Sequence, residues 1–176
     1  LTSDWIDRYQ ARRRPMSRVA VPETELPPTD ERTEIPTPHP VQIEALEALR
    51  QARGNGVKAG LVVLATGLGK TWLSAFDSRE FERVLFVAHR EEILAQAMHT
   101  YRRIRPDDRL GYYNGLDRES DAQVIFASIQ TLGRPAHLYR FAESHFDYIV
   151  IDEFHHAAAA TYRRLLQHFK PTFLLG

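Results

Sequence analysis

The segment A65-T-G-L-G-K-T71 decides how the rest of the chain is interpreted. It follows the apolar run G60-L-V-V-L-A65, which is typical of a buried strand, and it precedes residues with the spacing of a helix. A glycine-rich loop between a strand and a helix can direct successive backbone N–H groups at phosphate oxygens, and the positive end of the helix adds to the attraction. The segment therefore predicts a phosphate-binding loop.

The residue types in this loop suit different parts of a nucleotide. Two glycines allow the backbone to curl, Lys70 is expected to reach the β and γ phosphates, and the Thr71 hydroxyl is placed to bind Mg²⁺. Leu64 stands where the general G-x-x-x-x-G-K-[ST] pattern has its first glycine, so the strict pattern fails at one position. A glycine-rich turn without a ligand is the alternative. The predicted nucleotide-binding residues are Thr66, Gly67, Leu68, Gly69, Lys70 and Thr71.

A second polar cluster, I149-V-I-D-E-F-H-H-A157, places two acids and two histidines after an apolar run. Such an acidic strand end can complete a phosphate site, with Asp152 binding Mg²⁺ and Glu153 orienting the attacking water. We expect the strand before Asp152 to be the neighbour of the strand before Lys70, so that Lys70, Asp152 and Glu153 form the catalytic group. A zinc site is the alternative. It is disfavoured because the four side chains are too close in sequence to converge on one tetrahedral ion.

Composition excludes some classes of protein and leaves others open. Lys plus Arg and Asp plus Glu number 23 each, so a nucleic-acid surface would have to be local. The chain has no cysteine, which excludes disulfides, thiolate metal sites and thiol nucleophiles. No apolar run approaches the roughly 20 residues of a membrane helix, and we expect a soluble, cytoplasmic protein with no membrane partner.

The order of patterns along the chain predicts an α/β architecture. Short apolar runs at 60–65, 84–88, 124–127 and 148–151 are typical of strands buried on both faces. Segments with helical spacing lie at 41–50, 70–79, 90–105 and 157–169, the signal Y112-Y-N-G115 favours a short extra strand, and T172-F-L-L-G176 looks like another strand. This alternation predicts three layers around a mainly parallel sheet.

The first 38 residues differ from the rest of the chain in composition and pattern. Residues 2–9 could form a short helix, and prolines are concentrated up to Pro40, which predicts an extended arm. We therefore divide the chain into an N-terminal part, 1–38, and one domain, 39–176. Because the chain begins with Leu1 and stops after an apolar run, we expect it to be a piece of a longer protein.

At this point the sequence resembles superfamily 2 helicases and translocases of the DEAD/DEAH type. D152-E-F-H155 resembles their D-E-x-H box, and A65-T-G-L-G-K-T71 resembles their phosphate loop, which often lacks the first glycine. V87-A-H-R-E-E-I-L-A-Q96 resembles their motif Ia, and F126-A-S-I-Q-T-L132 resembles a segment that contacts nucleic acid. The resemblance covers roughly 38–176 and implies a RecA-like P-loop NTPase domain that uses ATP and Mg²⁺.

The resemblance also implies roles for individual residues. Gln42, in P38-H-P-V-Q-I-E-A-L46, resembles the glutamine that reads adenine, and His155 is expected to couple nucleotide state to movement. The residues expected to contact nucleic acid are His89, Arg90, Ser128, Gln130 and Thr131. Ordinary alternatives exist for each: a solvated helix residue for Gln42, a helix start for His89 and Arg90, helix capping for the third segment, and a buried histidine for His155.

The function implied is the first motor domain of an ATP-dependent DNA helicase or translocase. The family's next segment, motif III, and its second RecA-like domain would follow 176, and without that domain's arginines we expect little ATP hydrolysis. We expect DNA as the substrate because the sequences around His89 and Asp152 resemble those of bacterial repair and restriction motors. An RNA helicase, or a P-loop kinase or signalling ATPase without a nucleic-acid substrate, remains the alternative.

Overall fold

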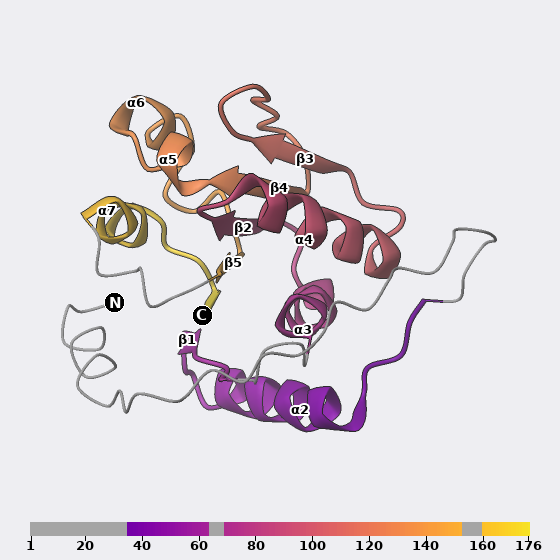
Figure 1. The fold of residues 1–176 in the computed structure, drawn as a ribbon. Helices are drawn as coiled ribbons and strands as arrows, with labels where there is room; N and C mark the ends of the chain where they lie inside the picture. The colour runs from indigo at the N-terminus through magenta and orange to yellow at the C-terminus, as the bar shows by residue number, and fades with distance from the viewer. Residues whose placement is uncertain (1–34, 64–68, 153–159) are drawn as a thin grey trace, which may run out of the picture.

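The computed structural model describes residues 35–63, 69–152 and 160–176 (Figure 1). The predicted N-terminal helix and most of the proline-rich arm lie outside this part of the chain. In chain order the described elements are α2 (Pro40–Gly54), β1 (Ala59–Gly60), α3 (Lys70–Asp77), the 3-10 helix η1 (Ser78–Glu80), β2 (Val84–Ala88), α4 (Glu91–Ile104), β3 (Leu110–Tyr113), β4 (Val124–Ser128), α5 (Ile129–Leu132), α6 (Pro135–Leu138), β5 (Tyr148–Ile151), α7 (Ala160–His168) and β6 (Phe173–Leu175).

Six strands form one sheet in the order β1-β6-β5-β2-β4-β3, and every neighbouring pair is parallel. The centre of the sheet is β2, whose Val84 is in register with Val124 on one side and Tyr148 on the other. Parallel strands require crossover connections, and helices on both faces supply them. The predicted α/β fold with a mainly parallel central sheet is therefore confirmed.

The alternation of side chains along each strand divides the core into two halves. Leu85, Val87, Ile125 and Ile149 point to one face, where α5, α6 and α7 cover them. The side chains between them in sequence belong to the other face, under α2, α3 and α4. Both faces of the central strands are buried, which is why these strands are continuously apolar rather than alternating. Two helical layers and the sheet between them make the three predicted layers (Figure 1).

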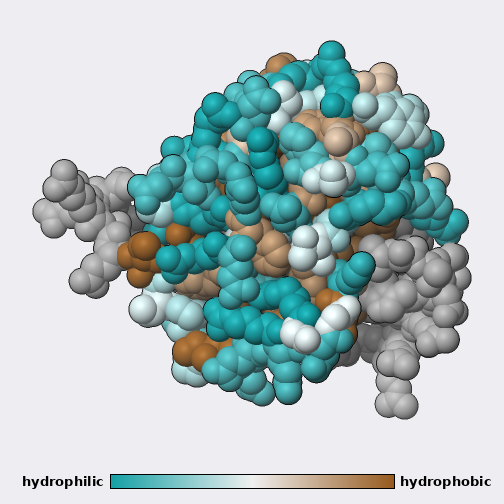
Figure 2. All heavy atoms as spheres, turned by 180° about the vertical axis from the view of Figure 1, so that it is seen from behind, coloured by the Kyte–Doolittle hydropathy of each residue, from teal (hydrophilic) through white to brown (hydrophobic). Residues whose placement is uncertain are grey.

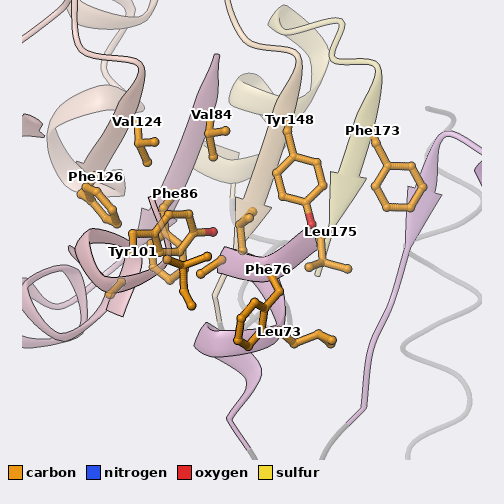
Figure 3. Close-up of a cluster of buried hydrophobic side chains, with 14 of the residues drawn as sticks. Leu73, Phe76, Val84, Phe86, Tyr101, Val124, Phe126, Tyr148, Phe173 and Leu175 are labelled. Atoms are coloured by element: carbon orange, nitrogen blue, oxygen red, sulfur yellow. The ribbon is translucent and has the colours of Figure 1, made fainter. Parts of the chain in front are cut away.

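Aromatic side chains fill the half of the core that lies under α3 and α4 (Figure 3). Phe86, at the centre of β2, lies with its ring centroid 5.8 Å from that of Phe126 and 6.0 Å from that of Tyr101. Leu73 and Phe76 of α3 pack into the same cluster. Because α3 begins directly after the predicted phosphate loop, this packing fixes the helix that carries Lys70 and Thr71.

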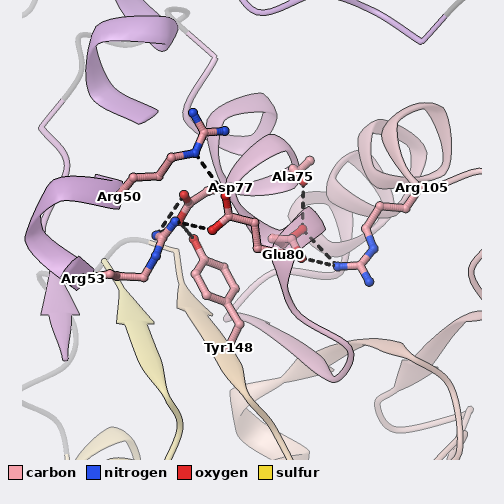
Figure 4. A network of polar contacts seen from close by, with 8 residues as sticks. Arg50, Arg53, Ala75, Asp77, Glu80, Arg105 and Tyr148 are labelled. Atoms are coloured by element: carbon pink, nitrogen blue, oxygen red, sulfur yellow. Dashed lines mark hydrogen bonds and ion pairs between the residues drawn. The ribbon is translucent and has the colours of Figure 1, made fainter. Parts of the chain in front are cut away.

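A polar network joins α2, α3 and β5 (Figure 4). Arg53 donates two hydrogen bonds to Asp77, of 2.9 and 2.8 Å, and a third of 2.9 Å to Glu80. The hydroxyl of Tyr148 donates to the same Asp77 carboxylate. The Arg53 guanidinium also lies over the rings of Phe81 and Phe173, with its carbon 5.4 and 5.1 Å from their centroids. This network ties the first helix of the domain to the sheet at the start of β5.

Most predicted elements are present, with shifted ends. The strands at 84–88 and 148–151 match β2 and β5, and the Tyr112–Gly115 signal corresponds to β3 and the turn after it. The predicted strand at 60–65 is assigned only as Ala59–Gly60, although its ladder continues where Val62 N donates to Gly176 O over 2.9 Å. Sequence analysis missed α5 and α6, which have four residues each and are too short for a helical pattern.

One spatial expectation is wrong. The strands leading to Lys70 and Asp152, β1 and β5, are not neighbours, because β6 lies between them and pairs with both. The reason is that β6 enters the sheet between two strands that precede it in the chain. Within the described residues, no helix is both long and apolar enough to span a membrane.

Candidate nucleotide site and strand ends

A cavity of about 240 Å³ lies where β1, β5 and β6 end and α3 begins. Its lining includes Val63, Lys70, Thr71, Asp152 and Gly176. Lys70 and Asp152 thus face one cavity although a strand separates the two strands that lead to them. An ammonium group, a hydroxyl and a carboxylate around one hollow can together hold a polyphosphate and a divalent cation.

The start of α3 depends on a glycine. Gly69 is the N-cap residue and has a φ of 79°, in the left-handed region that side chains rarely adopt. From there the chain turns directly into the helix, and Leu73 N donates to Gly69 O over 2.9 Å. A Cβ atom at Gly69 would lie 2.5 Å from Nε2 of Gln42, so the end of that side chain would have to move to make room for it. The first turn of α3 carries Lys70, whose side chain is exposed, and Thr71, which is half-buried.

Asp152 is held in place by the sheet rather than by a loop. Its backbone N–H donates to Val87 O over 3.0 Å, which continues the pairing of β5 with β2 by one residue. The residue is half-buried at the edge of the cavity. A carboxylate and a hydroxyl are oxygen ligands of the kind that Mg²⁺ prefers, so Asp152 and Thr71, which line the same cavity, suit a magnesium ion by residue type.

Five of the predicted site residues lie outside the part of the chain that the structure describes. They are Thr66, Gly67 and Leu68 of the phosphate loop, and Glu153 and His155 of the acidic segment. Their assigned functions remain predictions from the sequence.

Gln42 lies in the first turn of α2, close to Gly69. Its Oε1 accepts a hydrogen bond of 2.9 Å from His39 N, and its Nε2 approaches Gly69 O at 3.4 Å. The residue is 3% exposed, so it is not the solvated helix residue that was the alternative. It lines a second cavity, of about 450 Å³, together with Gly69 and Trp72.

The residues predicted to contact nucleic acid come together where β2 and β4 end side by side. Ala88 is in register with Ser128, so His89 and the start of α5 follow neighbouring strand ends. Gln130 connects them, because its Nε2 donates to His89 O over 2.7 Å while its Oε1 accepts from Ser128 Oγ over 2.8 Å.

These residues differ in accessibility. His89, Arg90 and Gln130 are exposed, whereas Ser128 and Thr131 are 5% and 7% exposed. Arg90 is the N-cap residue of α4 and Ser128 that of α5, but neither side chain makes a capping hydrogen bond. The geometry makes His89, Arg90 and Gln130 the members of this group that solvent or a ligand can reach.

Sequence analysis missed a further contact beside these strand ends. Asn114, 8% exposed, donates from Nδ2 to Glu91 Oε2 over 2.9 Å, and its Oδ1 accepts from the backbone N–H groups of Leu116 and Asp117. The Asn-Gly pair signalled the turn, but nothing near it in sequence pointed to Glu91. The contact fixes the loop after β3 to the first turn of α4.

Comparison with known proteins gives a family match over most of the chain. The family model described as "Type III restriction enzyme, res subunit" matches residues 35–176. IRC3 of Saccharomyces cerevisiae, which is named as a candidate ATP-dependent helicase, is 36% identical over 144 residues, covering 73% of this chain and 20% of IRC3. The EcoAI endonuclease subunit, a type I restriction enzyme of Escherichia coli, is 26% identical over 164 residues, covering 80% of this chain and 19% of that protein.

Solved structures share the fold. The SWI2/SNF2 ATPase core of Sulfolobus solfataricus, determined in complex with dsDNA, superposes with a TM-score of 0.64 at 20% identity over 80% of this chain and 31% of that one. A nuclease-deletion mutant of the type ISP restriction-modification enzyme LlaGI, in complex with a DNA substrate mimic, superposes with a TM-score of 0.59 at 16% identity. The match covers 78% of this chain and 17% of that one.

This chain therefore spans about a fifth of the length of the curated relatives it matches. The match to residues 35–176 covers most of the chain, and the parallel sheet agrees with it. The chain belongs to the family described as "Type III restriction enzyme, res subunit", and it contains the first RecA-like domain of a superfamily 2 helicase.

Proposed function

We propose that this chain is the ATP-binding motor domain of an ATP-dependent DNA helicase or translocase. The observation that carries the proposal is the single cavity lined by Lys70, Thr71 and Asp152 at the carboxyl ends of parallel strands. Ligands of open α/β sheets bind at this edge. The cavity offers a cation for phosphate oxygens and oxygen ligands for a metal ion, which is the set that nucleoside triphosphate hydrolysis requires.

The chemistry divides between the chain's residues and a metal ion. Lys70 would bind the β and γ phosphates, and Thr71 with Asp152 would hold Mg²⁺. The ion would supply positive charge against the phosphate oxygens when bound. Glu153, directly after Asp152, would orient and polarise the attacking water. His155 would connect the nucleotide site to the surface that contacts the strand.

The proposed DNA surface is the pair of strand ends that carry His89, Arg90 and Gln130. Their exposure beside one another, and the hydrogen bond from Gln130 to His89, support a surface that contacts a phosphate backbone without reading its sequence. Both superposed structures were determined with DNA or a DNA mimic, which favours DNA over RNA. Competition between single-stranded DNA and RNA tests this preference, and tighter binding of RNA would reverse it.

The proposal divides the chain into two parts with different functions. Residues 1–38 would form the segment before the motor domain, and 39–176 would form the first RecA-like half. The second RecA-like domain would supply the arginines that stabilise the transition state, an effect worth roughly 10³ to 10⁵ in rate elsewhere. The chain alone would then bind ATP but hydrolyse it slowly.

Titration of the chain with ATP and Mg²⁺ tests the proposal directly. Lys70→Ala should abolish measurable ATP binding, whereas Lys170→Ala should not, because Lys170 precedes β6 at the opposite end of the strand from the cavity. Glu153→Gln in the full-length protein should preserve ATP binding and abolish DNA-stimulated turnover. Equal ATP affinity in the Lys70→Ala and Lys170→Ala variants would contradict the proposal.

A further inference from the structure

The loop after β3 carries the most exposed large hydrophobic side chain among the described residues. Leu116 is 93% exposed. A Cβ atom added at its neighbour, Gly115, would meet nothing within 4 Å, so the tip of the loop stands in open space. Figure 2 shows a mostly hydrophilic face of the molecule, on which hydrophobic atoms reach the surface in a few small groups. Within the described chain Leu116 therefore has almost no packing, and a bound partner is needed to bury it.

The loop is a short hairpin with a defined turn. Tyr113, the last residue of β3, forms an antiparallel bridge with Arg118. Between them Asn114 closes the turn, because its backbone N–H donates to Asp117 O over 2.8 Å. Its Oδ1 accepts from the N–H groups of Leu116 and Asp117 over 2.9 and 2.8 Å. The backbone that carries Leu116 is thus held in one conformation, so little conformational entropy is lost when a partner covers the tip.

The hairpin stands beside the proposed DNA surface. β3 is the edge strand of the sheet and is parallel to β4, so the hairpin leaves the sheet at the same ends of the strands as His89 and Gln130 (Figure 1). Asn114 joins the hairpin to this surface, because its Nδ2 donates to Glu91 Oε2 over 2.9 Å and Glu91 directly follows Arg90. A DNA strand that crosses the ends of β2 and β4 toward the edge of the sheet meets the hairpin next.

The charges of the hairpin do not favour a contact with phosphate groups. Arg118 is exposed, but Asp117 and Glu119, its neighbours in sequence, are exposed as well. A single cation between two acids offers little net attraction for a phosphate backbone. The tip itself presents an apolar side chain, and the apolar surfaces of a nucleic acid are the faces of its bases. These faces are accessible in a single strand, whereas stacking covers them inside a duplex.

We propose that Leu116 is a pin that packs against the face of an unstacked base in the bound DNA strand. The proposal deepens the proposed function and rests on it. In this arrangement His89 and Arg90 contact the phosphate backbone, Asn114 holds the hairpin in place, and Leu116 takes the position of a neighbouring base in the stack. Apolar side chains insert between bases in this way in other protein–DNA complexes. Leu116 should therefore add affinity for DNA with accessible base faces and none for DNA without them.

Two matched DNA strands test the pin. A single strand with bases and an abasic strand of the same length carry the same phosphate groups, but only the first has base faces. In the full-length protein, Leu116→Asn should weaken binding of the first strand roughly fivefold and leave binding of the second unchanged. Leu116→Met should retain most of the affinity, because it keeps an apolar side chain of similar volume. Since neither variant alters a charge, the dependence of affinity on salt concentration should stay the same.

Three further variants separate the pin from other effects. Val57→Asn changes a valine that is 46% exposed ahead of β1, at the opposite ends of the strands from the hairpin, and should bind both DNA strands like the parent protein. Asn114→Ala removes the acceptor that holds the turn, so it should weaken binding of the strand with bases although Leu116 is present. Arg90→Ala should weaken binding of both strands.

The outcomes distinguish the pin from the surface beside it. If Arg90→Ala weakens binding of both strands and Leu116→Asn weakens neither, the pin is wrong and the proposed DNA surface stands. Equal losses on both strands in Leu116→Asn would also overturn the pin, because they would show that the hairpin does not contact bases. If Arg90→Ala binds both strands as tightly as the parent protein, the proposed DNA surface itself fails.

Discussion

The hydroxyl of Tyr148, the first residue of β5, donates a hydrogen bond of 2.8 Å to Oδ2 of Asp77, the last residue of α3. Both groups are buried, and 71 positions separate them in sequence. The carboxylate also accepts two hydrogen bonds from Arg53 of α2. One buried acid thus joins a strand and two helices, including the helix whose first turn carries Lys70.

Removal of this acid should destabilise the domain strongly. Asp77→Ala leaves Arg53, only 14% exposed, with Glu80 as its remaining carboxylate partner, and breaking a buried ion pair from one side costs about 3 kcal/mol of unfolding free energy. Arg50→Ala removes a neighbouring ion pair whose side chains are 55% and 49% exposed, and such pairs contribute less than about 1 kcal/mol. Urea unfolding at neutral pH measures both. Similar losses of unfolding free energy in Asp77→Ala and Arg50→Ala would show that burial does not strengthen the contribution of the Arg53–Asp77 pair.

Asp77 should also give the stability a characteristic pH dependence. Burial raises the pKa of Asp77 above its ordinary 3.8, and the hydrogen bond from Tyr148 and the charge of Arg53 oppose the shift. The folded chain then binds this proton more tightly than the unfolded chain, so stability falls as pH rises from 3.8 through the raised pKa. The difference in unfolding free energy between the parent chain and Asp77→Asn should decrease across this window. A difference that increases with pH would contradict the raised pKa.

Gly69→Ala should damage the nucleotide site more than the same change elsewhere. Gly56 has the same φ of 79° but nothing within 4 Å of an added Cβ, so Gly56→Ala measures backbone strain alone, about 1 kcal/mol. At Gly69 the new methyl group would also meet Gln42. We expect Gly69→Ala to lose more stability than Gly56→Ala. We also expect Gly69→Ala to weaken ATP binding and Gly56→Ala to leave it unchanged. Thermal unfolding and nucleotide titration of both variants provide the comparison.

Gly133 sits where α5 approaches α7. A Cβ atom there would overlap Cγ2 of Thr161 and lie 2.7 Å from the carbonyl oxygen of Ile129, so Gly133→Ala should lower stability by about 1 to 3 kcal/mol. Thr161→Ser removes the overlapping methyl group and should restore part of the loss in the double variant. Gly115→Ala, which meets nothing within 4 Å, should be nearly neutral. Full stability of Gly133→Ala would mean that the two helices separate easily.

Gln130→Ala tests whether the two strand ends act together. The change removes the hydrogen bond to His89 O and leaves Ser128 without its partner Oε1. In the full-length protein we expect weaker DNA binding with unchanged ATP affinity in the absence of DNA. Gln167→Ala, at an exposed position of α7, is the control and should bind DNA normally. Equal DNA affinity in both variants would remove Gln130 from the proposed surface.

The local pattern of apolar and polar residues was sufficient to predict the strands and long helices of this domain. Val84–Ala88 and Tyr148–Ile151 could be predicted because burial on both faces makes such strands continuously apolar. The shared cavity of Lys70 and Asp152 followed from the residue types that a phosphate site requires. The strands could be predicted from a few consecutive residues each, whereas Lys70 and Asp152 line one cavity although the strands before them are not neighbours.

Pairing at long range could not be predicted in the same way. Nothing within Phe173–Leu175 indicates that this strand enters between β1 and β5, so the expected adjacency of those two strands was wrong. The buried network of Asp77 could not be predicted because its partners, Arg53 and Tyr148, are distant in sequence. The contact between Asn114 and Glu91 was missed for the same reason.

The insertion of β6 also fixes the order in which the domain can be completed during synthesis. Among the described strands, β1 pairs only with β6, so the chain segment ahead of the phosphate loop has no partner until Phe173–Leu175 has left the ribosome. A nascent polypeptide therefore carries Lys70, the lysine of the proposed nucleotide pocket, before the part of the cavity wall that β6 supplies exists. The cavity that Lys70 lines is therefore complete only after β6 has been synthesised, because Leu175 and Gly176 belong to its wall.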